Sequence, residues 1–199
     1  MGYTLALFIH ILGALGLFFL VGVELLLLAR LRQARATAQV RELLATGRAI
    51  ERLHPPVTLA ILGAGLYLTA AAWGWRVAWI DCALALTLAL ALLGALLGAR
   101  RAAALCRAVD TQGDGPVGAA LAAAIRDPAF ATVSQTMGAL ALGIVFLMTA
   151  KPDWGGSLAT VGAALALGVA SAVPLWRSTP GHLPVSAGVA GTGDVPGDD

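Results

Sequence analysis

The chain has 199 residues, of which 59% are hydrophobic and 12% are charged. Soluble domains carry about 25% charged residues and must cover their surface with polar groups. The composition therefore excludes an ordinary soluble globule, a disordered chain and a nucleic-acid-binding protein. The net charge of +2, from 13 basic and 11 acidic residues, is too balanced to indicate an acidic partner.

Five apolar stretches with very few charges follow one another along the chain. A helix needs about 20 apolar residues to cross a bilayer, and each stretch is close to that length. They cover residues 4–29, 57–75, 77–99, 129–150 and 157–176. Helices are the expected form, because open sheet edges would leave backbone groups unpaired in lipid. The sequence thus predicts an all-α fold, a polytopic membrane helix bundle with five transmembrane helices.

The basic residues indicate how this bundle is oriented. All of them except Arg76 and Lys151 lie in two loops, residues 30–56 and 100–128, or after the fifth stretch. By the positive-inside rule these segments are cytoplasmic, which places the N-terminus outside and the C-terminus in the cytoplasm. Four of the five tryptophans then gather near the outer boundary as an aromatic belt: Trp73, Trp75, Trp79 and Trp154.

Residues 1–177 are expected to form one transmembrane domain, and residues 178–199 a disordered cytoplasmic tail rich in Gly, Pro and Ser. The first stretch has no positive charge before it and is too long for the apolar part of a signal peptide, so it is interpreted as a retained helix. Arginine far outnumbers lysine, which favours a GC-rich bacterial genome and hence the bacterial cytoplasmic (inner) membrane.

The two cytoplasmic loops are predicted to be largely helical. Residues 30–53 carry apolar positions at helical spacing between Arg and Glu, which is typical of an amphipathic helix near the membrane surface. The third helix is expected to continue past residue 101, and a second short helix to cover residues 117–126. Asp127 and Pro128 then form the N-cap and first turn of the fourth span.

Polar side chains at membrane depth are the candidate functional residues, because burying them in lipid is costly. The position of each in its stretch predicts an outer layer and an inner layer. The outer layer contains His10, Tyr67 and Asp81, and the inner layer contains Glu24, His54 and Gln135.

His10 has three interpretations that the sequence leaves open. Its imidazole forms a hydrogen bond with Asp81 or with a backbone carbonyl, it binds haem iron or copper as imidazoles commonly do, or it handles protons. His10 and Glu24 are fourteen residues apart, which puts them on nearly the same side of the first helix. Gly13 and Leu17 lie between them, so this face is expected to turn into the bundle.

The other candidates each have a structural alternative. Glu24 is interpreted either as a helix-end carboxylate that pairs with Arg52 or another interfacial arginine, or as a proton-relay or substrate residue. His54 is expected at the inner interface.

Asp81 is expected near Arg76 as an interfacial carboxylate, and Tyr67 as a packing group. Gln135 is expected to form hydrogen bonds between helices. Cys82 and Cys106 are too far apart on one helix to pair.

Two motifs and one loop carry a resemblance. The opening Leu5-x-x-x-x-His10-Ile-Leu-Gly13, the arginine-rich first loop and the segment Gly143-Ile-Val-Phe-Leu-Met-Thr-Ala-Lys-Pro152 together resemble small bacterial integral-membrane proteins of unknown function, over most of residues 3–177. The His-x-x-Gly opening is also similar to the first helix of the copper-resistance protein D group and, more distantly, of membrane protoporphyrinogen oxidases. This resemblance implies copper transit or haem-linked redox work, with the histidine role falling on His10. The chain departs from those families at Leu17, where an aromatic residue is common.

Several functions are compatible with these features. The favoured one is a non-enzymatic multi-pass membrane protein that binds or passes a small cargo or supports another membrane protein. The alternative is a redox protein holding haem or copper through His10, and a solute or ion transporter is a third. The expected partners are the lipid bilayer and either a second copy of the chain or another membrane protein. There is no glycine-rich phosphate loop, CxxC or HExxH motif.

Overall fold

The computed structural model describes residues 1–177, and the predicted tail lies outside the described residues. Seven α-helices and one π-helical turn make up most of this part of the chain. They are α1 (Gly2–Gln33), α2 (Thr37–Glu51), α3 (His54–Leu68), η1 (Thr69–Trp73), α4 (Ala78–Gln112), α5 (Ala119–Ile125), α6 (Pro128–Ala150) and α7 (Trp154–Arg177). The all-α prediction is confirmed for these residues, and five helical segments are long and apolar enough to cross a membrane.

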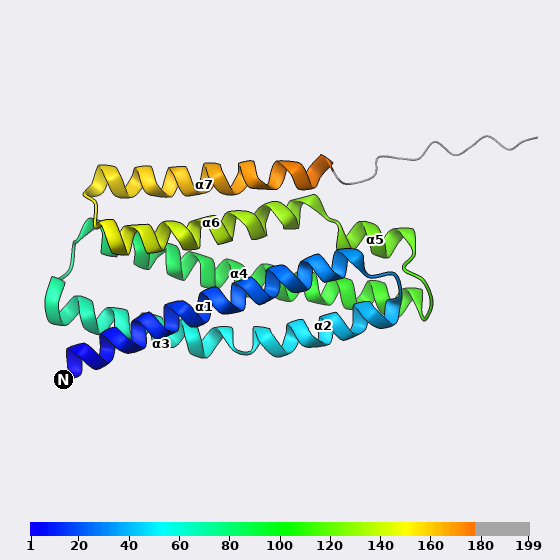
Figure 1. The fold of residues 1–199 in the computed structure, drawn as a ribbon, viewed down its shortest axis with the longest axis horizontal. Helices are drawn as coiled ribbons and strands as arrows, with labels where there is room; N and C mark the ends of the chain where they lie inside the picture. The colour runs from blue at the N-terminus through cyan, green and yellow to red at the C-terminus, as the bar shows by residue number, and fades with distance from the viewer. Residues whose placement is uncertain (178–199) are drawn as a thin grey trace, which may run out of the picture.

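The long helices lie side by side along one axis and alternate in direction (Figure 1). α1 packs along α3, α6 packs along α7, and α4 contacts α6. Within residues 1–177, α1 and α3 make few close backbone approaches to α4, α6 or α7. The bundle is therefore built from an α1–α3 pair and an α4–α6–α7 group.

Helix starts follow the local signals in the sequence. Pro55 and Pro56 occupy the first turn of α3, where a missing N–H leaves no hydrogen bond unmade. At the start of α6 the Asp127 carboxylate accepts a hydrogen bond from the Ala129 N–H at 2.9 Å, as expected for an N-cap. The helix α4 ends at Gln112, so the predicted extension past residue 101 is confirmed.

Small residues allow α6 and α7 to approach each other closely. A Cβ atom added at Gly168 would lie 2.5 Å from the Cα of Thr136, and one added at Gly143 would lie 3.1 Å from the Cβ of Ala164. Ser157 and Ala172 on α7 are fully buried. Close backbone contact of this kind is how apolar helices associate when no hydrophobic effect acts between them.

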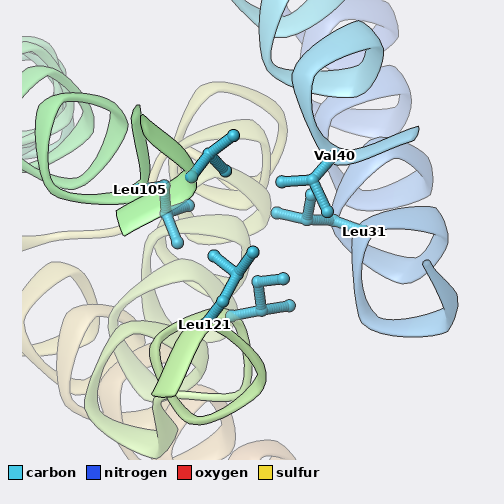
Figure 2. Close-up of a cluster of buried hydrophobic side chains, with 6 residues drawn as sticks. Leu31, Val40, Leu105 and Leu121 are labelled. Atoms are coloured by element: carbon cyan, nitrogen blue, oxygen red, sulfur yellow. The ribbon is translucent and has the colours of Figure 1, made fainter. Parts of the chain in front are cut away.

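The end of the bundle that contains α2 and α5 has a hydrophobic core of its own, which we call the cap (residues 30–56 and 100–128). Figure 2 shows its side chains, from α1, α2, α4 and α5, directed toward one another. Six buried residues form this core: Leu31, Val40, Leu105, Val109, Leu121 and Ile125. Both predicted cytoplasmic loops are thus parts of one packed unit.

Backbone hydrogen bonds also join the two loops of the cap. The Thr37 N–H donates to the Gly115 carbonyl at 2.9 Å, and the Val117 N–H donates to the Arg35 carbonyl at 2.9 Å. The buried Thr37 hydroxyl contacts both the N–H and the carbonyl of Gly115. Arg41 and Asp114 form a salt bridge beside them.

The expected amphipathic helix is present as α2, and its apolar face packs against the protein itself. α2 continues roughly along the line of α3 (Figure 1) and buries Val40 against α4 and α5. An apolar helix face packs against another apolar surface. For α2 this surface comes from the ends of α1 and α4, through Leu31, Leu105 and Val109.

The opposite end of the bundle carries four of the five tryptophans, Trp73, Trp75, Trp79 and Trp154. Trp73 and Trp79 meet edge to face with ring centroids 5.2 Å apart, and the Lys151 ammonium lies 4.3 Å from the centre of the Trp73 ring. Trp79 is only 8% exposed and packs with Leu147. The Trp79 ring therefore packs between α4 and α6, whereas the Trp73 ring remains exposed.

Candidate functional site

The α1–α3 contact contains both histidines of the described region, and we call it the polar seam, defined by His10, Glu24, His54 and the Ile61 carbonyl. Small residues bring the two helices together there: a Cβ added at Gly13 would lie 2.7 Å from the Ile61 side chain. The face of α1 between His10 and Glu24 therefore turns toward α3, as the sequence predicted.

At one end of the seam, Glu24 and His54 form a direct pair. The Nε2 of His54 donates to Oε1 of Glu24 at 2.8 Å. The His54 side chain is 28% exposed and the Glu24 side chain is 41% exposed, so the protein covers the pair only in part. The expected partner of Glu24 was Arg52 or another arginine, and the structure pairs it with His54 instead. His54 is the first residue of α3, and its ring reaches Glu24 on the neighbouring helix α1.

At the other end, His10 is held by a backbone carbonyl. Its Nδ1 lies 3.0 Å from the Ile61 oxygen, and because a carbonyl only accepts, Nδ1 carries the proton. Gly65 makes room for the ring, since a Cβ there would lie 3.2 Å from the imidazole. The carbonyl alternative from the sequence is the one observed, and Asp81 is not the partner. In the neutral ring, Nε2 is then the free acceptor nitrogen.

The remaining candidates lie outside the polar seam. Tyr67 is half exposed, with its hydroxyl beside Gly2 at the start of α1. Asp81 is half buried in the first turn of α4, and within residues 1–177 its carboxylate forms no salt bridge with Arg76. Gln135 is half buried on α6, and its side chain forms no hydrogen bond to a described residue.

The structural role of Arg101 was not predicted from the sequence. Its guanidinium donates to the Ile125 carbonyl at 2.9 Å and lies 3.6 Å from the centre of the Phe130 ring. It is also 3.9 Å from the Asp127 carboxylate. This side chain joins α4 to the end of α5 and the start of α6, a relation that no local pattern in the sequence indicates.

Residues 1–177 do not gather three or more His, Cys, Asp or Glu side chains around a possible metal ion. Cys82 and Cys106 are both free thiols, as predicted. His10 thus has one ring nitrogen held by a carbonyl and the other available to bind a metal. Among residues 1–177 no second ligand lies beside it.

Comparison with known proteins identified no relative of this chain. No protein-family model matches the chain, and no curated protein or solved structure is significantly similar to it.

Proposed function

We propose that the chain is a non-enzymatic multi-pass protein of the bacterial cytoplasmic membrane that binds and passes a small cationic cargo, in the simplest case a proton. The observation that carries this proposal is the 2.8 Å contact between Glu24 and His54. Ionisable groups within membrane-spanning helices are costly, and they commonly mark proton or ion pathways.

The chemistry of the pair suits a small cation. A carboxylate is an acceptor only, whereas an imidazole exchanges a proton near neutral pH without other chemistry. The protein covers these side chains only in part, since His54 is 28% exposed and Glu24 is 41% exposed. The pair can therefore be reached by a small cation from outside the α1–α3 contact.

The proposed orientation follows from the arginines. The cap carries ten of them, whereas the tryptophan end carries Arg76 and Lys151. With the cap in the cytoplasm, the Glu24–His54 pair lies near the cytoplasmic end of the bundle and His10 lies toward the outside.

Proton passage is tested in vesicles that contain the purified protein and a trapped pH-sensitive dye. When a potassium gradient and valinomycin impose an inside-negative potential, wild-type vesicles should acidify faster than protein-free vesicles. Glu24→Gln keeps the size of the side chain and removes its charge, so acidification should return to the protein-free rate.

Glu42→Gln is the matched control, because Glu42 is exposed on α2 away from the polar seam. This variant should acidify like wild type. If wild-type vesicles acidify no faster than protein-free ones, and replacement of the buffer cation by sodium or ammonium produces no flux either, the proposed passage is wrong.

A second candidate function is supported by the orientation of His10. Histidines that bind metals almost always donate the other ring N–H to a carbonyl or carboxylate, and His10 does so to Ile61. We propose as the alternative a haem-linked or copper-linked redox protein, in which a second protein group or a second copy completes the ligation. The fit is incomplete, because the described residues provide one histidine and no neighbouring ligand.

The absorbance spectrum and metal content of protein purified from haem-replete cells distinguish the two functions. The redox function predicts a stoichiometric haem band, or bound copper, that is lost in His10→Ala. In the cargo function both proteins are colourless and metal-free. His54→Ala is the control, since it removes the other imidazole of the seam and should leave any His10-dependent signal unchanged.

A further inference from the structure

The α1–α3 pair and the α4–α6–α7 group are held together mainly at the two ends of the bundle. Within residues 1–177, the backbones of α1 and α3 come close to those of α4, α6 and α7 at few points. At one end the cap joins the two parts, because its core takes side chains from α1, α2, α4 and α5 (Figure 2). At the other end, the tryptophan end, the two parts meet through aromatic rings. The ring contact therefore controls how far the two parts separate at that end.

One half of the ring contact is fixed in the α4–α6–α7 group. Trp79 of α4 is 8% exposed and packs with Leu147 of α6. Lys151 directly follows α6 in a left-handed conformation with a φ of 51°. Its N–H donates to the Leu147 carbonyl at 3.0 Å. The ring of Trp79 and the backbone of Lys151 are therefore anchored at the same buried leucine.

The other half of the contact, Trp73, belongs to the α1–α3 pair. Trp73 is the last residue of η1, the π-helical turn that continues α3. The Gly74 N–H donates to the Thr69 carbonyl at 2.8 Å and closes this wider turn. The extra residue of a π-helical turn rotates the side chains after it by about 100° relative to a regular α-helix. The turn thus sets the direction of the Trp73 ring, which is 44% exposed.

Two weak contacts join Trp73 to the fixed half. Its ring meets Trp79 at an interplanar angle of 85°, with the centroids 5.2 Å apart. The Lys151 ammonium lies 4.3 Å from the centre of the Trp73 ring and 5.7 Å from that of Trp79. Each such contact favours the closed arrangement by only about two- to tenfold. The cap has a buried core and backbone hydrogen bonds between its loops, so the tryptophan end is the weaker connection.

The link between the two halves has enough length for separation without unfolding. Residues 74–77 join η1 to α4 outside any helix, and a link of this length reaches roughly 15 Å when it is extended. Within it Arg76 has a positive φ of 72°. This conformation is uncommon and costly for a residue other than glycine. Movement of the link would relieve that strain, which favours opening.

From this arrangement we propose that Trp73, Trp79 and Lys151 form a releasable latch between the two parts of the bundle. When the latch opens, the α1–α3 pair moves away from the α4–α6–α7 group at the tryptophan end. The cap keeps the other ends of the helices joined. The Glu24–His54 pair lies near the cap, so this proposal is independent of cation passage.

Distances between spin labels test the latch in the full-length protein. The protein is reconstituted in nanodiscs of phosphatidylethanolamine and phosphatidylglycerol, after the two native thiols are removed by Cys82→Ser and Cys106→Ser. One pair of labels is attached at Leu5→Cys on α1 and Leu158→Cys on α7. Both positions are exposed near the tryptophan end, so this pair reports the separation of the two parts.

A second pair of labels reports the cap. It is attached at Ala38→Cys on α2 and Ala123→Cys on α5, which are both exposed. Because opening leaves the cap packed, this distance should stay the same in every variant. A change here would indicate general loosening of the fold.

Trp73→Leu should release the latch. It removes both contacts, because the ammonium of Lys151 lies over the same ring. The ratio of separated to closed molecules should rise about tenfold, and the α1–α7 labels should show a second, longer distance beside the single distance of wild type. Lys151→Gln should raise the ratio less, and Lys151→Arg, which keeps the cation, should behave like wild type.

Trp75→Leu is the matched control. Trp75 is 60% exposed, and its ring contacts no other ring or cation of residues 1–177. This variant should keep the wild-type distance between the α1 and α7 labels. The proposal is overturned if Trp73→Leu also keeps that distance, if Trp75→Leu lengthens it equally, or if the cap distance changes together with it.

Discussion

Gly168→Ala is expected to destabilise the bundle by about 1–3 kcal/mol, the usual effect of overpacking a close contact. The added Cβ would lie 2.5 Å from the Cα of Thr136. The neighbour is backbone rather than the end of a flexible side chain, so α6 and α7 must move apart along their shared contact. Helices that associate in lipid depend on such contacts, and reversible unfolding in mixed micelles measures the loss.

Gly162→Ala provides the control for this effect. Gly162 lies on the same helix, and no atom is within 4 Å of a Cβ built there. The substitution therefore adds helix propensity without a clash and should leave stability unchanged or slightly higher. Equal effects of the two substitutions would contradict the close α6–α7 contact.

Leu121→Ala should destabilise the cap by about 2–5 kcal/mol, the range for removing a large buried aliphatic side chain. Leu121 is 1% exposed and lies in the cap core with Val40 and Leu105 (Figure 2). Its loss leaves a cavity where α2, α4 and α5 meet, so these helices should become accessible to protease before the long apolar helices do.

The matched control is Leu53→Ala, in the same cap. Leu53 is 52% exposed, and exposed substitutions usually change stability by no more than about 0.5 kcal/mol. Limited proteolysis and thermal unfolding of the two variants are compared with wild type. Similar behaviour of both variants would mean that the cap is not an independently packed unit.

The sequence alone determined the helices and most of their ends. Hydropathy separated five apolar segments, because membrane-length helices need long runs without charge. Local chemistry placed Pro55 at the start of α3 and Asp127 at the cap of α6, since these signals act within one helical turn. The inward face of α1 also followed from helical spacing alone.

Tertiary structure decided which residues meet. Glu24 and His54 were predicted at the same end of the bundle, but their pairing depended on how α1 and α3 pack. The position of α2 against α4 and α5, the burial of Trp79 and the contacts of Arg101 with Ile125 and Phe130 likewise depend on residues distant in sequence. Periodicity fixes which face of a helix is apolar or polar, whereas the partner of that face is chosen by the packing of the whole bundle.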